Sequence, residues 1–159
     1  MKFELFYPQW KDRAVTFSYD DGQIFDRRNL GFAYSRTVES TENFRIPEDF
    51  MRWTPSCHHN DAFRGIAEKF LHKPDYQKLP LLYVWGHSFE FEREQTWEQM
   101  ESFCRKISNH ENVWYTTNMD YVNYMNVARN LIFNAECTYV ENLSKIKIYC
   151  KIDGECQIL

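Results

Sequence analysis

The alternation of apolar and polar positions predicts strands in the first third of the chain. In residues 14–20, apolar side chains stand at every second position, the period that is typical of a strand. Residues 31–38 form a second strand candidate. Residues 52–57 form a weaker one, because Pro55 cannot donate a hydrogen bond to a neighbouring strand.

The middle of the chain alternates between two kinds of hydrophobic pattern. Apolar runs at 81–87 and 113–117 are typical of buried parallel strands. Apolar residues at helical spacing over 61–72, 96–107 and 119–133 predict helices that alternate with these strands. This order indicates an α/β fold in which right-handed crossovers connect the strands of a parallel sheet.

Polar residues mark where these helices are expected to begin. Asn60 or Asp61 is available as N-cap of the first helix. Thr96 and Gln99 have the spacing of a capping box for the second, and Asp120 lies near the start of the third.

The hydrophobic pattern of the C-terminal tail differs from that of the middle of the chain. Two alternating runs in residues 145–159 flank Asp153-Gly154, which is a strong signal for a β-hairpin. Residues 135–142 are a candidate third strand of this unit. We therefore expect a partial α/β domain over 1–134 and a small C-terminal hairpin appendage over 135–159.

Charge and hydropathy narrow the class of protein. The net charge is −4 with both signs interspersed, and no basic stripe is present, so nucleic acid is not an expected partner. The N-terminus lacks the apolar core of a signal peptide, and no run of eighteen apolar residues predicts a membrane span. The five cysteines are odd in number and form no C-x-x-C pair, which favours free thiols and a cytoplasmic chain.

Three side chains with catalytic chemistry fall where predicted strands end. Asp20 and Asp21 follow the first strand, and His87 follows the strand at 81–87. Functional groups of parallel α/β folds collect at such strand ends. One carboxylate can bind a metal while the other accepts a proton, and a histidine can protonate a leaving group. The alternative is that Asp20-Asp21-Gly22 is only a turn capped by aspartate.

Four separated sequence blocks resemble motifs of one protein family and occur in the same order as in that family. They are TFSYDDG, WTPSCHHND, YVWGHSFEF and NVWYTTNMDYVNY. The first block is similar to the opening motif of the polysaccharide deacetylases, the NodB-homology group of carbohydrate esterases, and the others resemble later blocks of a bacterial branch. The resemblance implies a (β/α)7 barrel that uses zinc or cobalt to remove acetyl groups from N-acetylated oligo- or polysaccharides.

The resemblance also assigns roles to individual residues. It makes Asp20 the general base, Asp21 a metal ligand and His87 the general acid, although Ser88 stands where the family has an acidic neighbour of that histidine. The family's H-x-x-x-H metal motif and its Arg-Pro block are absent. Between Arg28 and Asn29 the chain passes directly to residues that precede a late strand. A complete barrel takes about 250 residues, so roughly a hundred are missing and a partial barrel is expected.

His58 and His59 are the candidates to replace the missing histidine pair. Neighbours in an extended segment point to opposite faces, so we expect at most one of them to join Asp21 at a metal. The alternative is that both are loop histidines in solvent or in contact with a ligand. A site with so few ligands predicts weak metal binding and slow removal of acetyl groups.

Other functions are compatible with this pattern. The chain can be a catalytically inactive carbohydrate-binding or protein-interaction module that exposes the aromatic faces of Trp53, Trp85 and Trp114. A truncated gene is a third alternative. Because a partial barrel leaves sheet edges uncovered, a homodimer that pairs such an edge is also expected.

Overall fold

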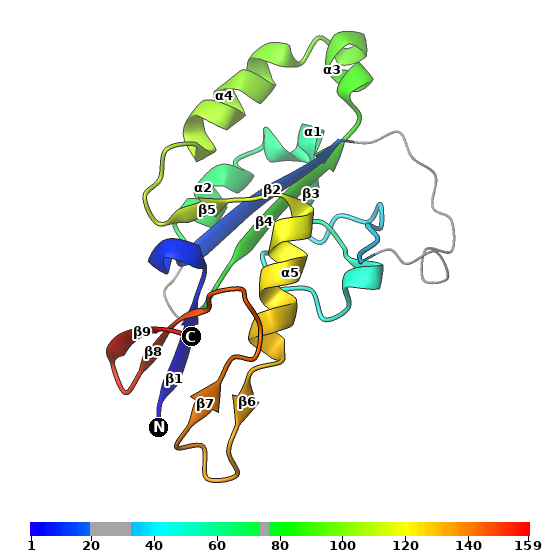
Figure 1. Cartoon of the computed structure of the whole chain (residues 1–159). Helices are drawn as coiled ribbons and strands as arrows, with labels where there is room; N and C mark the ends of the chain where they lie inside the picture. Colours follow the sequence, from blue (N-terminus) through cyan, green and yellow to red (C-terminus); the bar gives the residue numbers. More distant parts are fainter. Residues whose placement is uncertain (20–32, 74–76) are drawn as a thin grey trace.

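The computed structural model describes residues 1–19, 33–73 and 77–159 and shows a mixed α/β fold (Figure 1). In this part of the chain, the central sheet has four parallel strands in the order β3-β4-β2-β5. An antiparallel sheet of order β1-β8-β9 and a two-stranded β6-β7 ribbon accompany it.

The described part of the chain contains short strands and helices. The strands are β1 (Phe3–Phe6), β2 (Arg13–Tyr19), β3 (Cys57–His58), β4 (Leu81–Gly86), β5 (Val113–Tyr115), β6 (Ile132–Phe133), β7 (Val140–Glu141), β8 (Tyr149–Ile152) and β9 (Glu155–Ile158). The helices are α1 (His59–Ala62), α2 (Ile66–Leu71), α3 (Ser88–Glu94), α4 (Trp97–Ile107) and α5 (Asn118–Arg129), with 3-10 turns η1 (Pro8–Trp10) and η3 (Phe50–Arg52).

The central sheet confirms the prediction that the strands at 14–20, 81–87 and 113–117 are parallel neighbours. Every residue of β4 is buried, as expected for an inner parallel strand with both faces covered. Tyr19 pairs with Gly86, and His58 pairs with Trp85. The carboxyl ends of β2, β3 and β4 therefore meet at one edge of the sheet.

Two hydrophobic clusters cover the two faces of this sheet. Along β4, Leu81 and Tyr83 belong to the first cluster, which includes residues of α5. Leu82 and Val84 belong to the second, which includes residues of α2 and α4. Figure 1 shows α5 on one face of the sheet and α2 with α4 on the other. The period of two along the strand thus divides the core into two layers.

The helix predicted over 61–72 is interrupted. It forms as α1 and α2, separated at Gly65, whose φ of +90° lies in the left-handed region that favours glycine. The N-cap of α1 is His58, whose side chain accepts a hydrogen bond from the Asn60 backbone, and not Asn60 or Asp61 as predicted.

The later helices follow the sequence pattern more closely. α4 forms as predicted, although the Thr96 side chain makes no capping hydrogen bond. α5 begins after Thr117, whose hydroxyl accepts a hydrogen bond from the Asp120 backbone, and it ends at Arg129 instead of continuing to 133. The sequence pattern did not predict α3, a short helix directly after β4.

The strand candidates at 31–38 and 52–57 are reduced to minor features in the described part. Arg36 and Trp53 form an isolated parallel bridge, and residues 31–32 lie outside the described residues. The regular strand β3 begins only at Cys57, after Pro55. This is consistent with the missing N–H donor of proline.

The C-terminal hairpin forms as predicted. β8 and β9 pair across Asp153 and Gly154, whose φ values of +52° and +92° match the turn type favoured by Asp-Gly. The expected third strand at 135–142 is wrong, because β7 pairs with β6 and β8 pairs with β1. The hairpin is therefore joined to the first strand of the chain.

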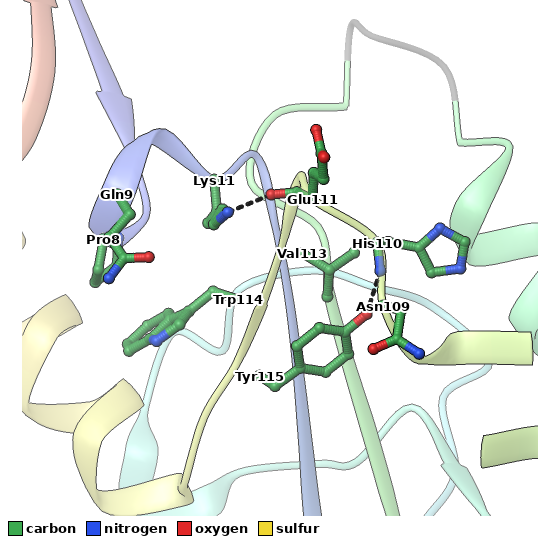
Figure 2. A pocket seen from close by; sticks show the side chains of 9 residues that line it. All are labelled: Pro8, Gln9, Lys11, Asn109, His110, Glu111, Val113, Trp114 and Tyr115. Atoms are coloured by element: carbon green, nitrogen blue, oxygen red, sulfur yellow. Dashed lines mark hydrogen bonds between the residues drawn. The ribbon is translucent and has the colours of Figure 1, made fainter. Parts of the chain in front are cut away.

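The three tryptophans proposed to form a binding surface differ in exposure. Trp53 is fully buried and Trp85 is 9% exposed, which corrects the expectation that both present open aromatic faces. Trp114 is partly exposed and lines a pocket beside β5 (Figure 2). All five cysteines are free, and no helix in the described ranges is long and apolar enough to cross a membrane.

The burial of Trp53 predicts a large effect on stability. Its ring packs against Phe50, Tyr83 and Tyr121. Trp53→Ala should therefore lower the free energy of unfolding by about 3–5 kcal/mol, measured by chemical denaturation. Val38→Ala, at a side chain that is 58% exposed, is the control and should change it by less than about 0.5 kcal/mol. An equal loss of unfolding free energy in both variants would contradict the packing of Trp53 in the core.

Candidate metal centre

The turn from β3 into α1 brings two consecutive histidines together. His58 has extended backbone angles (φ −70°, ψ 153°), and His59 begins the helix. Because the chain changes conformation between them, the strand rule of opposite faces does not apply, and their ring centroids lie 4.2 Å apart. The premise that the two rings point to opposite faces was therefore wrong, whereas the prediction that at most one of them joins Asp21 concerns a residue outside the described part of the chain.

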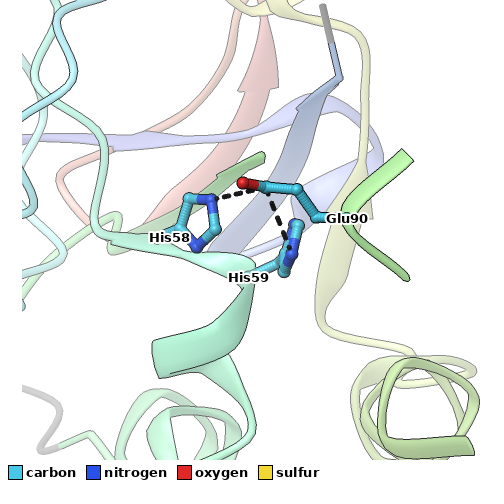
Figure 3. A group of neighbouring side chains, drawn as sticks. All are labelled: His58, His59 and Glu90. Carbon is cyan, nitrogen blue, oxygen red and sulfur yellow. Dashed lines mark hydrogen bonds and ion pairs between the residues drawn. The ribbon is translucent and has the colours of Figure 1, made fainter. Parts of the chain in front are cut away.

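Glu90 is the third member of the cluster (Figure 3). Its Oε2 atom lies 3.0 Å from His58 Nε2 and 3.6 Å from His59 Nε2. The same oxygen accepts a hydrogen bond of 3.1 Å from the His87 backbone N–H at the start of α3. The start of α3 thus points Glu90 back toward the end of β3.

The cluster has the chemistry and the spacing of a metal site. One ligand atom from each of His58, His59 and Glu90 lies within 4.8 Å of the others. Tetrahedral zinc with ligand bonds of about 2.1 Å places its ligand atoms roughly 3.4 Å apart, close to the distances measured from Glu90. Two histidines and a carboxylate are also a ligand set of catalytic zinc that leaves a position open. These three residues could hold a metal ion.

The surroundings of His59 support this interpretation. The residue is fully buried, and neither ring nitrogen has a hydrogen-bond partner among the described residues. The rings of Tyr19 and Phe91 flank it, with centroids at 5.8 and 4.5 Å. A buried imidazole without a partner is costly, and a metal ion bound at Nε2 would satisfy that atom.

The protonation states also suit a metal. Burial lowers the pKa of His59, and the nearby His58 lowers it further. Burial acts to raise the pKa of Glu90, but the backbone hydrogen bond from His87 and the three neighbouring histidines outweigh it, so this pKa is lowered. A neutral imidazole and an ionised carboxylate are the forms that bind a metal.

Outer contacts hold the ligands in place. Arg93 donates to Glu90 Oε1 at 3.2 Å and to Glu94 at 2.7 Å. Glu94 in turn accepts a hydrogen bond of 2.6 Å from Asn60, which connects α3 to α1. Such partners orient ligands and stabilise the form that binds the metal.

Gly86 provides the space that His59 occupies. A Cβ atom at this position would lie 1.8 Å from His59 Nδ1 and 2.5 Å from Cε1. No other residue type fits here while the imidazole stays in place. The end of β4 is therefore matched to the buried histidine.

Of the other site residues expected from the sequence, only His87 lies in the described part of the chain. Asp20 and Asp21 fall outside the described residues, which end before them at Tyr19, beside Gly86. His87 is at the rim, with Nδ1 3.5 Å from Glu90 Oε2 and its ring stacked on Phe89.

Sequence reasoning missed Glu90, although a signal for it was present. A glutamate three residues after His87, with an apolar residue next to it, has capping-box spacing, and this spacing could have predicted α3 and the direction of its carboxylate.

Comparisons with known proteins add no relative. No family model, no curated protein and no solved structure matches this chain.

The contact between Gly86 and His59 predicts a coupled effect. Gly86→Ala should lower the free energy of unfolding by about 1–3 kcal/mol, because the new methyl group overlaps the imidazole. In the Gly86→Ala/His59→Ala double variant this extra loss should largely disappear, since the overlap is gone. Chemical denaturation of the four proteins in the cycle measures the coupling. Strictly additive losses would show that the two residues do not share this space.

The lowered pKa of His59 predicts a pH dependence of the metal-free protein. Below the ordinary histidine pKa of 6.5 the unfolded chain binds a proton that folded His59 resists, so stability falls as the pH falls. Between pH 7 and pH 5, in the presence of a chelator, His59 should contribute a loss of stability as the pH falls, with a slope of at most about 1.4 kcal/mol per pH unit. His59→Gln should reduce this slope, whereas His72→Gln, at an exposed histidine, should retain it. The same slope in both variants would assign the dependence to other groups.

Proposed function

We propose that this chain is a metal-dependent hydrolase of the polysaccharide deacetylase kind, which removes acetyl groups from N-acetylated sugars on a partial (β/α) barrel. The convergence of His58, His59 and Glu90 at the carboxyl edge of the sheet carries the proposal. These residues come from two of the four blocks that resemble the family. Resemblance in sequence and proximity in space thus support the same site.

The proposed ion is zinc or cobalt. His58, His59 and Glu90 would hold it, and Asp21 is the further ligand expected from the resemblance. When bound, such an ion polarises an acetyl carbonyl and lowers the pKa of a coordinated water to about 7. The protein contributes the buried wall around His59, which limits access of bulk water to one side of the cluster.

The remaining roles belong to groups that move protons. The resemblance makes Asp20 the base that accepts a proton from the attacking water, and in the sequence Asp20 directly follows Tyr19, the residue that pairs with Gly86. His87 is the proposed acid, which protonates the leaving amine of the sugar. Its side chain is 30% exposed and lies beside Glu90, where substrate can reach it.

Several expectations accompany this proposal and stay predictions. The partner is an N-acetylated oligo- or polysaccharide, and the reaction takes place in the cytoplasm. Turnover is slow, because the blocks that align substrate in the family are absent and loss of positioning by about an ångström costs on the order of 100-fold in rate. Pairing of two copies along an open sheet edge would give a homodimer.

Metal binding tests the proposal directly. Calorimetric titration of the chelator-treated protein with zinc should show one site per chain. His58→Ala and Glu90→Gln should weaken it by more than about 100-fold, since loss of an outer partner alone costs about 10- to 100-fold. Glu98→Gln, which removes an exposed carboxylate from α4, is the matched control and should bind as the unaltered protein does. Equal zinc affinity in all four proteins would refute the site.

Acetate release from chitotriose then tests the reaction. With zinc or cobalt we expect slow release that is lost on chelation and in Asp20→Asn and His87→Ala. Because these two variants leave the three clustered ligands intact, they should still bind zinc. Release that persists with chelator would contradict a metal-dependent mechanism.

A further inference from the structure

A second cavity lies beside β5, away from the metal centre. It has a volume of about 570 Å³ and is lined by the turn at 8–11 and by residues 109–115 (Figure 2). The loop at 109–111 leads into the amino end of β5, whereas the metal ligands follow the carboxyl ends of β3 and β4. In a parallel sheet these are opposite ends, and Figure 1 shows η1 away from α1 and α3.

Two aromatic side chains from opposite faces of β5 line this cavity. The ring of Trp114 packs against Tyr7 and Tyr124 with centroid distances of 5.6 and 5.5 Å. Tyr115 is 43% exposed, and its hydroxyl donates to the Ile107 carbonyl at 2.7 Å. Because both side chains are already held in place, a ligand that contacts them pays little additional side-chain ordering entropy.

The opposite sides of the cavity carry amides (Figure 2). Gln9 and Asn109 are exposed, and their side chains make no hydrogen bond within the described part of the chain. Both have left-handed backbones, with φ values of +57° and +62°, which is uncommon for residues other than glycine. Each amide offers donors and an acceptor. The two amides thus place both donors and acceptors at the rim of the pocket.

The charges around the cavity do not favour an ion. The Lys11 ammonium donates a hydrogen bond to the backbone carbonyl of Glu111. Glu111 also lines the cavity. The His110 ring makes a hydrogen bond of 2.8 Å with the Lys106 carbonyl. One cation and one anion balance each other, so the chemistry suits a neutral ligand with many hydroxyl groups.

We infer that this pocket binds one neutral sugar ring of an oligosaccharide. The apolar face of the ring would contact the exposed ring of Tyr115, and its hydroxyls would bond to the amides of Gln9 and Asn109. An aromatic surface with a few placed polar groups is the usual composition of a small-molecule site. The inference goes beyond the proposed hydrolase, because this site contains none of the residues assigned to the reaction and does not require a metal.

The left-handed backbones make a clean test possible. In Gln9→Gly/Asn109→Gly both amides are removed, while glycine adopts the same backbone without strain. The melting temperature should therefore change by only a few degrees. Calorimetric titration of the chelator-treated full chain with chitotriose, cellotriose and mannotriose should show binding of at least one probe. The double variant should weaken it by about tenfold or more through loss of the amide hydrogen bonds.

Glu90→Gln separates this inference from the proposed function. It should weaken zinc binding and leave the affinity for the sugar unchanged. Absence of binding by all three probes would overturn the inference, and so would binding that the double glycine variant retains. Sugar binding lost in Glu90→Gln but retained in the double variant would place the sugar at the metal centre instead, and would also overturn it.

Discussion

The fit of the His59 ring against Gly86 is the constraint on which the candidate metal centre depends. A buried imidazole can lie at the end of β4 only because no Cβ stands there. With that ring in place, α1 begins at His59 and α3 begins directly beyond His87, and Glu90 lies within reach of both histidines. The contact between the His59 ring and the end of β4 thus lies where the two helices and the three potential ligands meet.

The sequence predicted the elements whose pattern is local. The strands at β2, β4 and β5 could be recognised because burial on one or both faces leaves a period of two or a continuous apolar run. The hairpin was predictable because Asp153 and Gly154 both take positive φ values, which few dipeptides tolerate. The partner strand of β8 was not predictable from the sequence. Its pairing with β1 joins residues about 150 positions apart, and neither strand carries a signal for the other.

The candidate site was only partly predictable, for a geometric reason. His58 and His59 were identified as possible ligands, but the strand rule placed them on opposite faces, and only a change from extended to helical backbone between them brings both rings to one point. Gly65, which divides the following helix, was read as part of a continuous helix because one glycine does not erase a helical pattern. Glu90 was absent from the prediction because α3 is only seven residues long.

The arrangement of the potential ligands explains how this cluster can form from few elements. His58 and His59 belong to β3 and α1, Glu90 belongs to α3, and the strands that lead to them, β3 and β4, are paired neighbours. None of these contacts involves a strand beyond this pair. The three potential ligands thus depend on one strand pair and the two helices that follow it, so the cluster can form from this local arrangement alone. Alignment of a substrate in the proposed hydrolase has no such local support, so metal binding and rate of turnover would be separable properties.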